Sequence, residues 1–150
     1  MPSLVFQYSP NVGPLIQVAI WKPGFVPSQQ ATAVPNPLAI TFYNALIDTG
    51  ASCTCITQKV INDIGLTPIG KQPVGGVHGK KVVNQYPFQV ALVFPQAQAA
   101  SGTVTANVMA MPVTGVEFDS PGGFDVLLGR DIICRGILHL SWDGHGTFAL

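Results

Sequence analysis

Charged side chains are scarce in this sequence. Asp, Glu, Lys and Arg make up 9% of its 150 residues, against about 25% in a typical soluble domain. The seven basic and seven acidic residues balance to a formal net charge of zero. No basic surface is therefore expected to neutralise phosphates, which argues against a nucleic-acid partner and against membrane binding through a polybasic segment. So little charge leaves apolar surface uncovered, which favours an oligomer.

Long apolar runs and cysteine-rich patterns are also missing. No apolar stretch approaches the roughly 18 residues that cross a bilayer, so no membrane span is expected. The first twenty residues lack Lys and Arg, and Pro10 and Pro14 interrupt them, which argues against a signal peptide. Three cysteines (Cys53, Cys55 and Cys134) are an odd number, which is typical of reduced thiols in a cytosol-like compartment. We therefore expect a cytoplasmic protein.

Helical periodicity is nearly absent, and 16 glycines and 13 prolines punctuate the chain. Short strands joined by many turns are the natural interpretation, so we predict one all-β domain over residues 1–150 with one or two short helices. Strands are expected at Leu15–Trp21, 38–47, 90–94, 104–113 and 124–128. Hairpins are expected over 72–91 and between 139–142 and 147–150, and surface loops or turns over 22–37 and 96–102.

Residues 57–64 carry the clearest helical pattern in the chain. Val60 and Ile64 share one face, Thr57 is a candidate N-cap, and Gly65 stands where a helix C-cap is expected. A second, shorter helix of one or two turns is predicted within 130–135.

The pattern that indicates chemistry is Ala-Leu-Ile-Asp-Thr-Gly-Ala-Ser over residues 45–52. Asp48 directly follows an apolar strand. Gly50 permits a sharp turn, and its amide can donate to the carboxylate, while the hydroxyl of Thr49 can lock the loop. The same tripeptide is also common in an Asx-type turn that only connects strands, so the motif alone leaves a structural role open.

A second pattern, Val-Leu-Leu-Gly-Arg-Asp-Ile-Ile, stands about eighty residues later at 126–133, and a hairpin with a glycine-rich tip at 75–79 lies between the two. The order is acid loop, helix, glycine-tipped hairpin, apolar-apolar-glycine segment and helix. Over about residues 38–140 this arrangement resembles the retropepsin-like aspartic proteases, the single-domain relatives of pepsin.

The resemblance implies a closed, β-barrel-like acid protease fold of a single lobe. It also implies a reaction in which two aspartates share one proton and activate a water against a peptide bond. Only Asp48 precedes Thr-Gly or Ser-Gly; the other aspartates are Asp63, Asp119, Asp125, Asp131 and Asp143. The second Asp48 must then come from a second chain across a two-fold axis. We therefore expect a homodimeric aspartic endopeptidase acting on a peptide or protein substrate.

Site roles follow from the same resemblance. The expected catalytic residues are Asp48, Thr49 and Gly50, with Thr49 bonding across the two-fold axis. The expected substrate-binding residues are Ala51 and Ser52, together with the flap residues Gly75, Gly76, Val77, His78 and Gly79. The expected supports of the site are Leu127, Leu128, Gly129 and Arg130.

Two departures from the family leave alternatives open. Many retroviral members carry an acid at the position of Ser52 or Cys53 that pairs with an arginine after the apolar-apolar-glycine segment. That acid is missing here, so a solvated or helix-capping Arg130 is an equally good interpretation. The chain before Leu15 is rich in turn formers, so the dimer interface can differ and use 139–150 instead. A catalytically idle dimer that binds peptides or proteins is the alternative function.

No cofactor and no metal are expected. Cys53 and Cys55 could face the same side and bind a metal together with a histidine, but the sequence has no second cysteine pair and no His-x3-His spacing.

Overall fold

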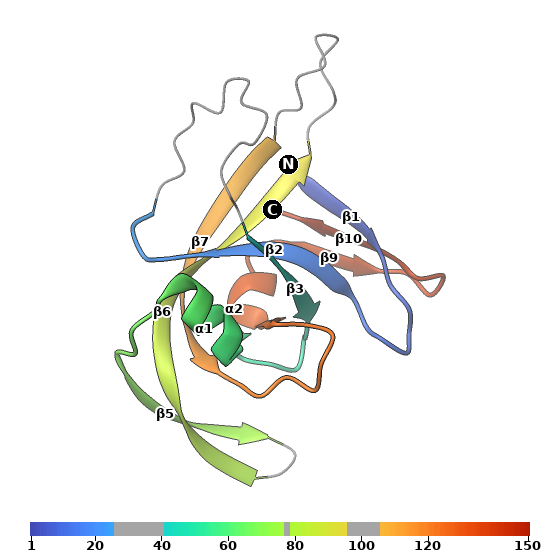
Figure 1. Ribbon diagram of the computed structural model, residues 1–150. Coiled ribbons are helices and arrows are strands. Elements are labelled where there is room, and N and C mark those ends of the chain that lie inside the picture. Colours follow the sequence, from blue (N-terminus) through green and yellow to red (C-terminus); the bar gives the residue numbers. More distant parts are fainter. Residues whose placement is uncertain (26–40, 77–78, 96–105) are drawn as a thin grey trace.

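The computed structural model describes residues 1–25, 41–76, 79–95 and 106–150. Within these ranges the chain forms ten strands and two short helices (Figure 1). The elements are β1 (Ser3–Gln7), β2 (Leu15–Trp21), β3 (Phe42–Ile47), β4 (Cys55–Ile56), α1 (Gln58–Ile64), β5 (Gly70–Gly76), β6 (Gly79–Pro95), β7 (Ala106–Glu117), β8 (Val126–Leu128), α2 (Arg130–Ile133), β9 (Ile137–Leu140) and β10 (His145–Ala149). The predicted all-β class with one or two short helices is confirmed.

Six strands close into a barrel. Their order is β2-β3-β8-β4-β7-β6, and an additional pairing of β2 with β6 closes the ring. The β3–β8 and β4–β7 pairs are parallel, and the other pairs are antiparallel. Since β3 and β8 run in the same direction, their carboxyl ends meet, and the loops at 48–52 and 129–130 leave the barrel side by side.

Alternating side chains fill the barrel. On β3, Tyr43, Ala45 and Ile47 are buried while their neighbours are more exposed, as expected for a strand with one face on a core. Phe88 and Leu92 of β6 point into the same cluster. The core therefore fixes the register of β3, and a slip by one residue would turn Ile47 outward.

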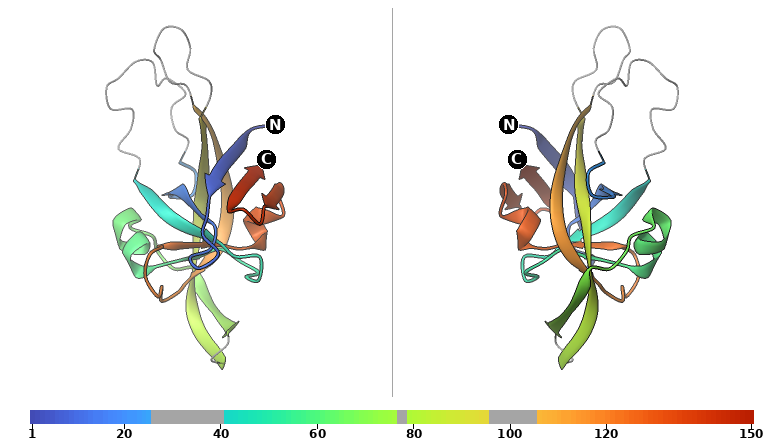
Figure 2. Two further views of the ribbon diagram at one scale, coloured as in Figure 1. Left: turned by 90° about the vertical axis from the view of Figure 1, so that its right-hand side faces the viewer. Right: turned by 90° about the vertical axis from the view of Figure 1, so that its left-hand side faces the viewer.

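Strand β6 is longer than the sequence indicated. The prediction placed one β segment up to residue 91 and a second strand at 90–94, but β6 runs unbroken through Gly79–Pro95. Its first half pairs with β5 and its second half with β7 and β2. Each half has a partner that continues the hydrogen-bond ladder, so no turn is needed between them. The β5–β6 hairpin projects beyond the barrel (Figures 1 and 2).

The helices confirm most of the local signals. α1 ends at Gly65, whose backbone is left-handed at φ 69°, as a glycine C-cap should be. Thr57 is the N-cap residue, as predicted, but its hydroxyl makes no capping hydrogen bond and is directed to Asp125 instead, 3.4 Å away. α2 is a single turn, which is within the one or two turns predicted. α1 and α2 lie on opposite sides of the barrel (Figure 2).

A separate three-stranded sheet joins the two ends of the chain in the order β1-β10-β9. The β9–β10 hairpin is the predicted C-terminal hairpin. Strand β1 is unexpected, because the local sequence there is rich in turn formers. It forms because Leu4 stands opposite Phe148 in the ladder and packs against the core.

Several predictions fall outside the described residues. These are the flap positions Val77 and His78, the turn at 96–102, most of the loop at 22–37 and the ends of two predicted strands. Among the described residues, no helix is long and apolar enough to cross a membrane.

The same substitution at two positions of β6 tests the barrel core. Val90 is 0% exposed and Val82 is 64% exposed. Val90→Ala deletes two buried methyl groups, so the free energy of unfolding should fall by about 2 kcal/mol. Val82→Ala should change it by less than about 0.5 kcal/mol. Urea denaturation at one fixed protein concentration measures both, and equal losses would contradict this arrangement of β6.

Candidate active site

Asp48 is the first residue after β3. Its backbone N–H donates to the carbonyl oxygen of Leu128 at 3.0 Å, which continues the β3–β8 ladder by one more bond. Ile47 before it is buried, and Asp48 itself is half-buried. The barrel therefore fixes the backbone of Asp48 and leaves its carboxylate partly accessible.

The loop after Asp48 folds back on the carboxylate. The Gly50 N–H donates to Asp48 Oδ1 at 2.8 Å, as the sequence predicted, and the Ala51 N–H donates to the Asp48 carbonyl at 3.2 Å. A Cβ atom on Gly50 would lie 3.1 Å from Oδ1. Glycine is thus favoured here by close approach to the carboxylate rather than by a left-handed backbone. Thr49 and Gly50 are exposed.

The apolar-apolar-glycine segment packs directly on the acid loop. The Arg130 N–H donates to the Ala51 carbonyl at 2.9 Å. A Cβ atom on Gly129 would lie 2.9 Å from the Cα atom of Cys53 and closer still to its carbonyl group, so no side chain fits at this crossing. Leu127 pairs with both Leu46 and Cys55 in the sheet. The four residues expected to support the site thus all contact the acid-loop segment or the strands that flank it.

A pair of polar residues that sequence reasoning missed holds the two segments together. Thr54 is 0% exposed, its N–H donates to Asp131 Oδ2 at 2.9 Å, and its hydroxyl donates to Asp131 Oδ1 at 2.7 Å. The same hydroxyl oxygen accepts from the Gly129 N–H at 3.2 Å. We call this group of contacts the Thr54–Asp131 clamp. The signal available in the sequence was an acid directly after Gly-Arg and a threonine just beyond Asp-Thr-Gly-Ala-Ser.

Arg130 acts here through its backbone. Its N–H bonds to the acid loop, whereas its side chain is exposed. The neighbouring Asp131 makes the side-chain contacts across the site instead. The interpretation of Arg130 as a solvated side chain agrees with this geometry of the single chain.

The predicted flap is the tip of the β5–β6 hairpin. Gly75 pairs with Lys80, and Gly76 pairs with Gly79, whose φ of 108° is accessible mainly to glycine. A Cβ atom on Gly75 would meet nothing within 4 Å. Ser52 is exposed and Ala51 is half-buried on the acid loop. Among the described residues, the expected substrate-binding positions thus come from two elements, the acid loop and the β5–β6 hairpin.

Two thiols lie beside the acid loop. A hydrogen bond from Cys55 lowers the pKa of Cys53 to about 7, against the opposing effects of burial and of Asp131. The pKa of Cys55 is raised well above its usual range, first by its hydrogen bond with Cys53, then by burial, and also by the charges of Asp131 and Asp48. In the described part of the chain, no group of three or more His, Cys, Asp or Glu side chains is placed to hold a metal.

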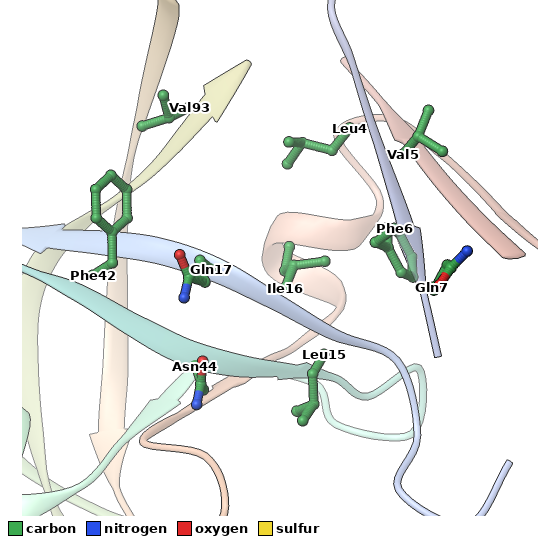
Figure 3. Close-up of a pocket in the computed structure, with 10 residues that line it drawn as sticks. All are labelled: Leu4, Val5, Phe6, Gln7, Leu15, Ile16, Gln17, Phe42, Asn44 and Val93. Carbon is green, nitrogen blue, oxygen red and sulfur yellow. The ribbon is translucent and has the colours of Figure 1, made fainter. Parts of the chain in front are cut away.

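A groove of about 510 Å³ lies elsewhere, between β1 and the barrel strands β2 and β3 (Figure 3). Phe6 and Ile16 face it from its two sides, and none of the predicted site residues lines it. A cleft shared by two subunits would not appear as a cavity in one chain, so this groove does not argue against a site at Asp48.

Comparisons with known proteins agree with the geometry. A family model described as "Aspartyl protease" matches residues 41–132. Among solved structures, the chain is similar to a retropepsin-like aspartic protease from Rickettsia conorii, with a TM-score of 0.56 and 11% identity over 97% of this chain and 89% of that chain. It is also similar to the EIAV protease complexed with the inhibitor HBY-793, with a TM-score of 0.45 and 20% identity over 87% of this chain and 93% of that chain. No curated protein matches the sequence significantly.

The family match covers more than half of the chain and contains both the acid loop and the segment that supports it. The protein therefore belongs to the aspartyl protease family. Its closed barrel is the retropepsin-like fold that the resemblance predicted.

Removal of one hydroxyl tests the Thr54–Asp131 clamp. Thr54→Val leaves Asp131 Oδ1 and the Gly129 N–H without this partner in a buried place, so the free energy of unfolding should fall by about 2 kcal/mol. Thr57→Val is the matched control: this hydroxyl is also buried, but its bond to Asp125 is long at 3.4 Å. The control should lose less than about 1 kcal/mol. Urea denaturation measures both, and the reverse order would contradict the clamp.

Proposed function

We propose that this protein is a homodimeric aspartic endopeptidase that uses one Asp48 from each subunit. The observation that carries the proposal is the held acid loop: Asp48 is fixed to β8 through its backbone, and Gly50 holds one carboxylate oxygen. Thr49 and Gly50 are exposed beside it. A fixed carboxylate on a surface with few other charges can be buried against a second copy of the chain, and that copy would complete the site.

The need for a second copy follows from the chemistry. Hydrolysis by this mechanism requires one carboxylate to take a proton from water and another carboxyl group to donate one to the scissile carbonyl. In this sequence only Asp48 lies in an Asp-Thr-Gly loop. A two-fold axis next to Asp48 would bring two such loops together, and a closed dimer is the commonest symmetric assembly.

In this mechanism the two Asp48 carboxyl groups would take different roles. Oδ1 of Asp48 is held by the Gly50 amide, so Oδ2 is free to accept a proton from the water. The water oxygen attacks the carbonyl carbon while the protonated Asp48 of the other subunit donates to the carbonyl oxygen. Proton transfer to the amide nitrogen then releases the amine product. Because one carboxyl must keep a proton, activity should be greatest at acidic pH.

Substrate binding would use main-chain groups. Ala51 and Ser52 would line the floor of the cleft, and the flap residues 75–79 would cover an extended peptide bound as an added strand. Thr49 would hydrogen-bond to its counterpart across the axis. An idle dimer that binds the same peptides without cleaving them is the alternative, and an activity assay separates the two.

Asp48→Asn tests the catalytic role. The amide keeps the size of the side chain but cannot act as a base, so cleavage of a fluorogenic peptide library should fall by roughly 10³-fold or more. Asp119→Asn is the matched control, because the only ion pair of this exposed acid among the described residues is with the exposed Lys81; it should keep full activity. Circular dichroism should show both variants folded. Retention of most of the activity by the Asp48→Asn variant, or a wild-type protein that binds but does not cleave any peptide, would refute the proposal.

A subunit-mixing experiment tests the dimer. Wild-type protein is refolded together with a ninefold excess of the Asp48→Asn variant, so that random pairing leaves about one-tenth of the original wild-type homodimers. Activity should fall to about that fraction if both acids are needed. Refolding with the same mass of an unrelated protein is the control. Full activity in the mixture would show that one chain suffices.

A further inference from the structure

Strand β6 changes partner where it leaves the barrel. Its ladder with β7 ends at the pair Gln85–Val116, and the residues before Gln85 pair with β5 in the hairpin that projects beyond the barrel (Figure 1). One residue beyond that last pair stand Asn84 on β6 and Glu117 on β7. We call this place the fork. The direction of the hairpin depends on what holds the two strands together here.

The carboxylate of Glu117 bridges the fork. Its Oε1 accepts from the backbone N–H of Asn84 at 3.1 Å and from the side-chain amide of Asn84 at 2.9 Å. Its Oε2 accepts from the hydroxyl of Tyr86, 3.3 Å away. Tyr86 is buried, and Glu117 and Asn84 are half-buried. The side chain of Glu117 therefore extends the contact between β6 and β7 past the last backbone pair.

The backbone of Glu117 is held on its other side by β4, the strand that follows the acid loop. Glu117 pairs with Ile56 in the β4–β7 ladder. The Val116 N–H donates to the carbonyl of Thr54 at 3.3 Å. Because Thr54 belongs to the Thr54–Asp131 clamp, Glu117 connects the segment that fixes the acid loop to the root of the hairpin.

The two arms of the hairpin are also joined to each other. β5 and β6 pair continuously from Gly70–Gln85 to Gly76–Gly79. The side-chain amide of Gln85 donates to the side-chain carbonyl of Gln72 on the opposite arm. An arm that is fixed at its root therefore fixes the direction of both arms.

A second contact between the hairpin and the end of β7 is the ion pair of Lys81 with Asp119 at 3.0 Å. The two side chains are 72% and 91% exposed. An ion pair so open to water contributes little. Asp119 is thus an acid two residues beyond Glu117 that faces the same hairpin without a buried partner, and it provides a matched control.

We propose that Glu117 is a positioning residue for the flap: its carboxylate fixes the root of the β5–β6 hairpin to the barrel beside β4, and so holds the hairpin over bound substrate. The effect on substrate rests on the proposed protease function, whereas the hydrogen bonds at the fork do not. A flap would contact the peptide in the ground state and in the transition state alike. Loosening it should therefore raise KM more than it lowers kcat.

The experiment compares Glu117→Ala, Glu117→Gln and the control Asp119→Ala in the full chain. Hydrogen exchange followed by NMR reports on the Asn84 N–H at the fork and on the Val90 N–H in the barrel, and peptide cleavage gives KM and kcat. In Glu117→Ala, Asn84 should exchange at least about tenfold faster and KM should rise at least about fivefold, with kcat within about twofold. Glu117→Gln should restore both, because its amide can accept from Asn84 and donate to the Tyr86 hydroxyl. Asp119→Ala should behave as the wild type.

The outcomes separate this proposal from the protease function. If the wild-type protein cleaves no peptide, the protease proposal fails, and the exchange of Asn84 still tests whether Glu117 holds the fork. Unchanged exchange in Glu117→Ala, or a Glu117→Gln variant that is equally impaired, would overturn the role of Glu117. Faster exchange with an unchanged KM would overturn its effect on the flap.

A general loss of stability is distinguished by the barrel amide. An equal rise in exchange at Val90 and Asn84 in Glu117→Ala would show global destabilisation and would count against the proposal. If Glu117→Ala does not fold, Asn84→Ala removes one of the three hydrogen bonds while keeping the backbone bond. It should raise KM by about twofold to threefold, and an unchanged KM would contradict the proposal.

Discussion

The site depends on the contact between two segments that lie far apart in the sequence. Thr54 and Asp131 are 77 residues apart, yet two hydrogen bonds join them, and Gly129 completes the group by donating to the Thr54 hydroxyl. Breaking the hydrogen bonds of such a carboxylate costs free energy, because each broken bond leaves a polar group with neither water nor a protein partner. The clamp therefore gives the acid loop a fixed backbone. The absence of a side chain at Gly129 is what lets the two segments approach.

The same arrangement leaves the chemistry incomplete in one chain. The acid loop presents one carboxylate, that of Asp48, and the exposed Thr49 and Gly50 lie beside it. Family membership gives the class of protein, whereas the homodimer and the reaction remain the proposal made above. The low charge of the whole chain is consistent with that proposal, because a surface with few charges is more easily buried against a second copy.

Local signals were reliable where one element could be identified from its own residues. Leu15–Trp21 is an apolar run interrupted only by Gln17 and bounded by turn formers, and it forms β2 with the predicted bounds. Gly65 ends α1 because its left-handed backbone is a property of that residue. Predictions failed where a distant partner decided the outcome. Strand β1 forms because β10 lies beside it, and the Thr57 hydroxyl is directed to Asp125 instead of making a capping hydrogen bond.

The sequence by itself determined the chemical content of the site: one acid in an Asp-Thr-Gly loop, a glycine amide able to reach its carboxylate, and a glycine-tipped hairpin. These follow from residue type and immediate neighbours. Only the tertiary structure decided that Leu128 holds Asp48, and that Asp131 rather than the Arg130 side chain crosses to the segment after the acid loop. These contacts depend on how β3, β4 and β8 are ordered around a closed barrel, and that order depends on the burial of the whole core rather than on any local pattern.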